Sequence, residues 1–310
     1  MIDYGFDKET DAAMQRLLEE RTAYVNEALY RYFEAKKDGF KLFEAMEYSL
    51  MAPGKRIRPV LTLALCEAFG VDRDKAMPYA AALEMVHTHS LVHDDLPCMD
   101  NDTLRRGRPT CHMQFGENLA LLCGDALMAA AFEIAFEAAC RDGAKGALAG
   151  KYVAELTGAA GMLGGQELDL AYERLSAEEV TEEMLLRMNA LKTGALLKCC
   201  VKIADALADT DTPPARADMD SAYRYIDALG LAFQIQDDIL DVTGDAYKTG
   251  KNTGSDVKDN KATFVTVLGL EKAVQRAEFY TGAAIEAAGA MGARGLFLKW
   301  LAVKLLRRDS

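Results

Sequence analysis

Helix-patterned stretches interrupted by few prolines constrain the fold of this 310-residue chain more than any other feature. The chain has seven prolines, and none follows Pro214. Because proline disrupts the interior of a helix, this distribution leaves room for long helices. Apolar residues recur at intervals of three and four in segments rich in Ala, Leu, Met and Glu, whereas β-branched alternation is scarce. The sequence therefore predicts an all-α fold, and its length fits one domain covering residues 1–310.

Breakers and capping patterns divide the chain into about ten or more expected helices. The capping-box pair Ser176 and Glu179 is expected to open one helix, and Ser221 to cap another. The segment 243–261, rich in glycine, asparagine and lysine, is expected to be irregular. The expected helices cover roughly residues 10–35, 40–50, 57–69, 75 into the first aspartate cluster, 117–140, 145–171, 178–207, 221 into the second aspartate cluster, 262–288 and 293–308.

Two aspartate-rich clusters, about 140 residues apart, lie within these apolar segments. Carboxylates are costly to bury unless a cation meets them, so the clusters point to a shared cation site if they face each other. Mg²⁺ suits such oxygen ligands, and it usually binds one or two carboxylates together with substrate phosphates. The first cluster contains Asp94, Asp95, Asp100 and Asp102, and the second contains Asp237, Asp238 and Asp241.

In the second cluster, Asp237 and Asp241 are about one helical turn apart, and they would repel each other without a cation between them. A solvated acidic helix face is the alternative. The apolar neighbours Ile235, Ile239 and Leu240 leave little of this helix for solvent. Metal binding is therefore the favoured interpretation.

In the first cluster, Pro97 is expected to end the helix just after Asp95, and the following turn to return Asp100 toward the pair. The segment TLRRGRPT comes next, and its three arginines could each hold phosphate oxygens through two hydrogen bonds. A surface loop of ion pairs is the alternative for this segment. The arginines are Arg105, Arg106 and Arg108.

Other basic residues occur in GKRIRP (54–59), in KTG (192–194) and at Lys251 and Lys261. GKRIRP begins a helix, where backbone N–H groups and the helix dipole favour an anion. Each signal is weak alone, because basic loops are usually just solvated. Together they suggest that several helices deliver cations to one pocket.

Composition excludes several other kinds of protein. The net charge of −12 argues against nucleic acid and against an anionic membrane surface as partners. The seven cysteines lack metal-site spacing and suggest free thiols in a reducing cytoplasm. No signal peptide or membrane span is expected, because the N-terminus is acidic and no apolar run is long enough. Zinc is not expected either, because only His89 and His93 could share a helix face.

These motifs together resemble the trans-isoprenyl diphosphate synthases, specifically the short-chain enzymes that make farnesyl or geranylgeranyl diphosphate. The resemblance covers most of the chain in order. It implies a helical bundle around a deep central cavity, with the two aspartate clusters facing each other across its mouth. The matching segments are GKRIRP (54–59), HTHSLVHDDLPCMDNDTLRRGRPT (87–110), GDAL (124–127), GGQELDL (164–170), KTGALL (192–197), FQIQDDILDVTGD (233–245) and a lysine-bearing segment to Lys261.

The resemblance also implies the chemistry and the residues that perform it. An allylic diphosphate ionises, the double bond of isopentenyl diphosphate attacks the resulting cation, and proton loss gives a product five carbons longer. Three Mg²⁺ ions per site and a homodimer are implied.

The implied metal ligands are Asp94, Asp95, Asp100, Asp237, Asp238 and Asp241. The implied contacts of isopentenyl diphosphate are Lys55, Arg58, His87 and Arg106. The implied contacts of the allylic diphosphate are Arg105, Lys192, Thr193, Gln234, Lys251 and Lys261. The implied catalytic set is Asp94, Asp95, Asp100, Arg105, Lys192 and Asp237.

Product length is expected to depend on His89, five residues before Asp94 and about 7.5 Å along the helix, with Ser90 beside it. In enzymes of this kind an aromatic residue there usually floors the cavity for farnesyl products, whereas a smaller or flexible one allows longer chains. Histidine is intermediate and departs from the common pattern. We expect farnesyl diphosphate as the main product, with geranylgeranyl diphosphate as the alternative.

Two more distant alternatives remain. A terpene cyclase would share the fold and one aspartate cluster, but such enzymes usually carry a different second metal motif and lack the GKRIRP segment. A non-catalytic regulatory subunit of a partner synthase would be expected to have lost aspartates or arginines that this chain keeps.

Overall fold

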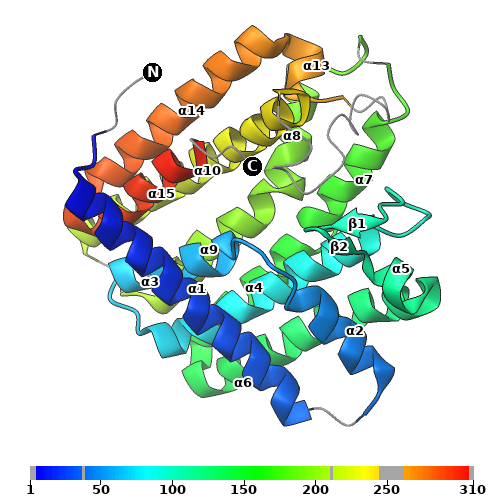
Figure 1. The fold of residues 1–310 in the computed structure, drawn as a ribbon. Coiled ribbons are helices and arrows are strands. Elements are labelled where there is room, and N and C mark those ends of the chain that lie inside the picture. The colour runs from blue at the N-terminus through cyan, green and yellow to red at the C-terminus, as the bar shows by residue number, and fades with distance from the viewer. Residues whose placement is uncertain (1–4, 37–38, 177, 210–211, 244–261, 307–310) are drawn as a thin grey trace.

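The computed structural model describes residues 5–36, 39–176, 178–209, 212–243 and 262–306. Most of these residues are helical, which confirms the predicted all-α fold. Figure 1 shows the helices packed side by side, with the amino-terminal helix α1 crossing the front of the bundle.

The elements occur in the following order along the chain. The first part of the chain forms α1 (Lys8–Lys36), α2 (Lys41–Leu50), α3 (Ile57–Ala68), α4 (Arg73–Asp94), β1 (Leu104–Arg105), β2 (Arg108–Pro109), α5 (Cys111–Phe115) and α6 (Glu117–Thr157). The second part forms α7 (Met162–Tyr172), α8 (Glu182–Lys192), α9 (Gly194–Leu207), α10 (Pro213–Thr243), α13 (Phe264–Leu268), α14 (Leu270–Ala290), a 3₁₀ turn (Gly292–Gly295) and α15 (Leu296–Leu306).

The predicted break after the first aspartate pair is confirmed. Helix α4 ends at Asp94 with Asp95 as its C-cap, because Pro97 cannot continue the helix. The chain then folds back, and the backbone N of Asp100 donates to the backbone O of Asp94 at 2.8 Å. The expected return of Asp100 toward the pair is therefore present in the backbone.

Several helix boundaries differ from the prediction. Ser176 does donate to Glu179, but this pair lies in a turn, and α8 begins later behind the cap residue Thr181. Ser221 lies inside α10, where its hydroxyl donates to the backbone O of Ala217. Helix α10 begins earlier, at Pro213, because a proline in the first turn gives up no needed N–H bond.

Three of the predicted helices are divided. The expected 145–171 helix is interrupted after Thr157, and the expected 178–207 helix is divided at Thr193 into α8 and α9. Gly269, with a φ of 83°, separates α13 from α14 within the expected 262–288 helix. Residues 244–261, which make up nearly all of the expected irregular segment, lie outside the described residues.

A two-stranded antiparallel ribbon, which the sequence did not predict, follows the first aspartate cluster. Strand β1 pairs with β2 so that Arg105 lies opposite Arg108. The two residues at the tip, Arg106 and Gly107, have φ angles of 54° and 73°. Positive φ at both central residues is what a tight hairpin matched to the strand twist requires. The turn therefore holds the backbone of Arg106 in a conformation that side chains other than glycine rarely adopt.

The two aspartate-bearing helices are anchored in two clusters of buried apolar side chains. Helix α4 lies in the larger one, packed along α6 and against α3 and α9. The smaller one includes Ile235 and Ile239 of α10 together with Phe264 of α13. Both aspartate clusters therefore lie on helices that are held in place by buried apolar side chains. The deep central cavity implied by the resemblance stays a prediction.

One segment, Glu117–Tyr172, contains a stretch with a mean hydropathy of 1.8, long and apolar enough by composition alone to cross a membrane. Core helices of water-soluble proteins pass the same test. Helix α6, which makes up most of this segment, packs along α4, α9 and α2. These contacts bury 39% of the apolar stretch, so they explain only part of its apolar character.

Candidate functional site

Asp94 is a buried carboxylate at the carboxyl end of α4, where the helix dipole disfavours negative charge. Its Oδ1 accepts a hydrogen bond of 2.6 Å from Nε2 of Gln166 on α7. Burial raises the pKa of Asp94, and the nearby ammonium of Lys192 offsets only part of this effect. The described residues around Asp94 therefore offset only part of the cost of burying its charge.

Asp95 is 2% exposed and is paired with the ribbon. The Nε of Arg105 lies 2.7 Å and 2.9 Å from the two carboxylate oxygens of Asp95. Arg105 also reaches Asp102 at 3.2 Å. Burial by itself would lower the pKa of Arg105, but Asp95 outweighs it and the pKa is raised. Arg105 is therefore a fixed cation whose position depends on Asp95.

Lys192, at the end of α8, is the second cation beside Asp94. Its ammonium donates to Asp169 of α7. Burial would lower the pKa of Lys192, but Asp169 and Asp94 raise it on balance. A Cβ on Gly165 would lie 2.1 Å from the backbone N of Lys192, so glycine is what allows α7 to pack this closely on α8. In Figure 1, α7 lies on the same side of the bundle as the ribbon.

A chain of side-chain hydrogen bonds connects this region to α10. The hydroxyl of Thr193 donates to Oε1 of Gln234 at 3.0 Å, and Nε2 of Gln234 donates to Asp238. Asp238 is buried, and its other oxygen accepts from the backbone N of Phe264. Asp241 differs, because its Oδ2 is buried and accepts no hydrogen bond within the described part of the chain.

A separate group of cations surrounds His87. Burial lowers the pKa of His87 well below its ordinary value, and Arg58 and Arg106 act in the same direction. Arg106 approaches the backbone O of Ala52 at 3.4 Å, and its guanidinium lies where a Cβ on Gly54 would be. GKRIRP and the ribbon tip therefore meet, which brings three of the four residues implied for isopentenyl diphosphate together. The fourth, Lys55, is exposed.

Arg56 and Arg58 are adjacent in the motif but differ in their roles. Arg56 forms a salt bridge of 2.8 Å with Glu84, and both side chains are 2% exposed. It also donates to Asn26 and to the backbone O of Leu50, so it is fully used in holding α1, α2 and α4 together. The Nε of Arg58, in contrast, is buried and has no hydrogen-bond partner among the described residues.

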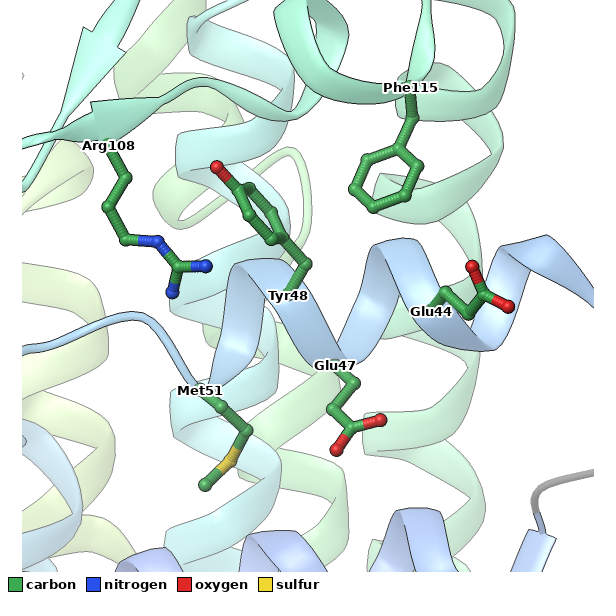
Figure 2. A pocket seen from close by; sticks show the side chains of 6 residues that line it. All are labelled: Glu44, Glu47, Tyr48, Met51, Arg108 and Phe115. Atoms are coloured by element: carbon green, nitrogen blue, oxygen red, sulfur yellow. The ribbon is translucent and has the colours of Figure 1, made fainter.

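Arg108 is directed away from both groups. Figure 2 shows its guanidinium beside Tyr48, and it lies 4.3 Å from the ring centroid. The hydroxyl of Tyr48 donates to the backbone O of Pro109, and this hydrogen bond connects strand β2 to α2. A pocket of about 320 Å³ is found here, and Arg108 is its only lining residue that was among the candidate phosphate contacts. The lining residues are Glu44, Glu47, Tyr48, Met51, Arg108 and Phe115.

The acidic residues fit a hard cation only together with a ligand that brings more oxygen atoms. No group of three His, Cys, Asp or Glu side chains converges on one point within the described ranges. The expected ligands are all carboxylates, the donors that Mg²⁺ prefers. The orphaned oxygen of Asp241 and the raised pKa of Asp94 both mark sites that a cation would relieve. These residues therefore fit magnesium delivered with phosphate oxygens.

His89 is 2% exposed and fixed between α4 and α6. Its Nδ1 lies 3.0 Å from the backbone O of Gly124, and because a carbonyl only accepts, Nδ1 carries the proton. The ring of His93 packs edge-on against it, with centroids 4.6 Å apart. Ser90 is buried as well and donates to the backbone O of His87.

The structure thus brings most of the expected residues together in two groups around the acidic clusters. Lys251 and Lys261 lie outside the described residues. The sequence reasoning missed Gln166 and Asp169, polar residues within the GGQELDL segment that hold Asp94 and Lys192. Their position in an otherwise apolar helix was the signal that could have identified them.

The chain is similar to known proteins along most of its length. The family model described as polyprenyl synthetase matches residues 41–288. A geranylgeranyl diphosphate synthase of Cyanophora paradoxa is 42% identical over 273 residues, covering 87% of this chain and 88% of the relative. A farnesyl diphosphate synthase of Geobacillus stearothermophilus is 40% identical over 275 residues, covering 88% and 90%. The solved structure of a geranyltransferase from Helicobacter pylori, complexed with magnesium and isoprenyl diphosphate, superposes with a TM-score of 0.78 at 27% identity over 98% of both chains.

The histidine at position 89 makes stability depend on pH. Burial lowers the pKa of His89 to about 4, with His93 acting in the same direction. Above pH 6.5 the ring is neutral in both states, but as pH falls below 6.5 only the unfolded chain takes up the proton, so stability falls. At pH 5.5 the loss from this residue is about 1 kcal/mol.

Urea unfolding at pH 7.5 and 5.5 measures this effect. His89→Asn should reduce the difference between the two unfolding free energies by about 1 kcal/mol. Thr88→Val, which alters a buried neighbour that does not titrate, should leave the difference as in the wild type. An unchanged difference in His89→Asn would contradict the assignment.

Proposed function

Because this chain belongs to the polyprenyl synthetase family, we propose that it is a short-chain prenyl diphosphate synthase. It joins isopentenyl diphosphate to an allylic diphosphate, either dimethylallyl or geranyl, and releases pyrophosphate. The observation that carries this proposal is the presence of two separate cation groups beside one set of buried carboxylates. One group lies around His87, and the other consists of Arg105 and Lys192.

The group around His87 suits the diphosphate of the attacking substrate. Arg58 has a buried Nε without a partner among the described residues, and Arg106 is held by the ribbon tip. Guanidinium groups bind phosphate oxygens through paired hydrogen bonds. We assign Arg58, His87 and Arg106 to isopentenyl diphosphate, with Lys55 at the exposed edge. A terpene cyclase would have no use for this second group, which favours the synthase over that alternative.

Arg105 and Lys192 suit the allylic diphosphate, because both lie beside Asp94. Thr193 and Gln234 continue the same surface toward α10. As the carbon–oxygen bond of the allylic substrate breaks, negative charge grows on the departing pyrophosphate, and cations held in place stabilise it. The released pyrophosphate is then placed to accept the proton lost in the final step. We keep Lys251 and Lys261 as proposed contacts of the same group.

The proposed magnesium ligands are Asp94, Asp95, Asp100, Asp237 and Asp241, with three ions per site. When bound, Mg²⁺ would neutralise charge on the diphosphate oxygens and so favour ionisation. Asp95 already accepts two close contacts from Arg105. In this arrangement Asp95 holds Arg105 in place as well as contributing charge.

Substituting the first aspartate of each cluster tests the metal assignment. Asp94→Asn and Asp237→Asn should each weaken Mg²⁺-dependent binding of inorganic pyrophosphate at least about tenfold, because a ligand is lost. Isothermal titration calorimetry with and without Mg²⁺ measures this directly. Glu44→Gln, which removes one exposed charge on α2, serves as the matched control. Undiminished binding in both aspartate variants would exclude these residues as ligands.

We propose farnesyl diphosphate as the main product. The support is the rigidity of His89, which the Gly124 carbonyl and the ring of His93 hold in one orientation. A fixed ring is a better floor for a fifteen-carbon chain than a flexible side chain. Geranylgeranyl diphosphate is the second candidate, because the relatives include many synthases named for that product.

Sizing the products after incubation with Mg²⁺, isopentenyl diphosphate and dimethylallyl diphosphate tests both candidates. Wild-type protein should yield mainly fifteen-carbon product, His89→Ala mainly longer product, and His89→Phe fifteen-carbon product again. Mostly twenty-carbon product from the wild type would decide for the second candidate. A wild-type protein inactive with every primer would instead support the regulatory-subunit alternative.

We further propose a homodimer that forms through α6. Leu121, Leu122 and Phe136 are 48%, 53% and 59% exposed and share one face of this helix. Large apolar side chains exposed on one face of a helix are candidates for contact with another protein. A second copy of the chain is the proposed occupant.

The free thiols at all seven cysteine positions are consistent with the cytoplasm as the proposed compartment.

Sedimentation velocity tests the dimer. The wild type should sediment at twice the monomer mass, and Phe136→Ser should weaken association at least about tenfold. Phe279→Ser on α14, where the ring is 64% exposed, is the matched control and should leave the dimer intact. Dissociation by Phe279→Ser alone would move the interface to α14.

A further inference from the structure

Both carboxylate oxygens of Asp238, in the second aspartate cluster, accept hydrogen bonds from the protein. Its Oδ1 accepts from Nε2 of Gln234 at 3.0 Å, and its Oδ2 accepts from the backbone N of Phe264 at 2.8 Å. The side chain is 6% exposed. A carboxylate used in this way is turned toward the protein rather than toward a neighbouring ligand.

Phe264, whose backbone N–H donates to Asp238, is the first residue of α13. The N–H groups at the start of a helix have no partner within the helix. Thr263 and Thr266 satisfy two of the backbone N–H groups at this end through a capping box, and Asp238 satisfies that of Phe264. The ring of Phe264, 1% exposed, belongs to the same apolar cluster as Ile235 and Ile239 on either side of Asp238. Asp238 therefore fixes the start of α13 on α10.

Through Gln234, Asp238 is also connected to Thr193 at the junction of α8 and α9. Gln234 can donate to Asp238 through Nε2 only while its Oε1 faces the hydroxyl of Thr193, which donates to it at 3.0 Å. Asp238 thus selects the orientation of the Gln234 amide. Both Thr193 and Gln234 lie on the surface that we assign to the allylic diphosphate.

We infer that Asp238 is a positioning residue rather than a metal ligand, because it orders Gln234, Thr193 and the start of α13 around the site. This inference rests on the proposed function for its catalytic consequence, but its structural part does not. It also departs from the expectation, implied by the resemblance, that Asp238 belongs to the metal ligands. Asp237 and Asp241 remain the proposed ligands on α10.

Asparagine at position 238 separates the two roles. It has the same shape, so its Oδ1 can accept from Phe264 while its Nδ2 donates to a rotated Gln234 amide. Gln234 would then donate to Thr193, whose hydroxyl can also accept. The hydrogen-bond chain survives in reversed polarity, whereas the negative charge that a metal ligand needs is lost. Alanine at position 238 removes both.

Hydrogen exchange of the metal-free protein provides the first readout. In Asp238→Ala, the amides of residues 264–268 should exchange about tenfold faster or more than in the wild type, because the Phe264 N–H loses its acceptor. In Asp238→Asn and in the control Asp237→Asn, exchange of the same amides should stay within about threefold of the wild type. Equal acceleration in the Asn and Ala variants would overturn the inference.

The Mg²⁺ concentration that gives half-maximal binding of inorganic pyrophosphate provides the second readout. It should rise by no more than about threefold in Asp238→Asn and at least about tenfold in Asp237→Asn. An equal rise in both variants would make Asp238 a ligand. If the wild type proved inactive in prenyl transfer while both readouts behaved as expected, the proposed function would fail and the positioning role would stand.

Discussion

The structure depends on how the bundle tolerates two carboxylates at the carboxyl end of α4. Both are buried, and the helix dipole at that end adds to the unfavourable potential. Each is matched by a group from a different element, Asp94 by Gln166 of α7 and Asp95 by Arg105 of the ribbon. These contacts connect both α7 and the ribbon to the carboxyl end of α4. A cation that arrives with phosphate oxygens would meet a site already organised by these contacts.

Neighbouring arginines in this chain perform different tasks because the backbone directs them differently. Along the ribbon, Arg105 is paired with Asp95, Arg106 faces Gly54 and Arg108 stacks on Tyr48. In the GKRIRP segment, Arg56 is a buried structural cation, whereas Arg58 keeps a donor without a protein partner among the described residues. Counting basic residues therefore overstates how many can reach a ligand.

Apolar periodicity and proline predicted the helical class and the break after Asp95, because both carry strong local signals. The residues of both cation groups were implied by the family resemblance, and their roles stay a prediction. Several helix starts were predicted wrongly, at Ser176 and Ser221, because a capping residue is also stable inside a turn or a helix. The ribbon and the role of Gln166 could not be predicted, since they depend on contacts between segments far apart in the chain. The same reason applies to Asp238, whose acidic neighbours suggested a ligand while its partner, Phe264, is remote in sequence.

The ribbon has one more consequence. Arg105 and Arg106 are consecutive residues, and consecutive Cα atoms are about 3.8 Å apart. If they serve the two diphosphates as proposed, a single peptide unit sets the spacing between the two substrates. Tyr48 holds the paired strand β2 to α2 through the backbone O of Pro109. Substitutions here would disturb both substrates at once. Divergence of such enzymes toward new products is then expected at positions farther along α4 from the aspartates, such as His89, five residues before Asp94. A residue there can change without altering the groups that hold the diphosphates.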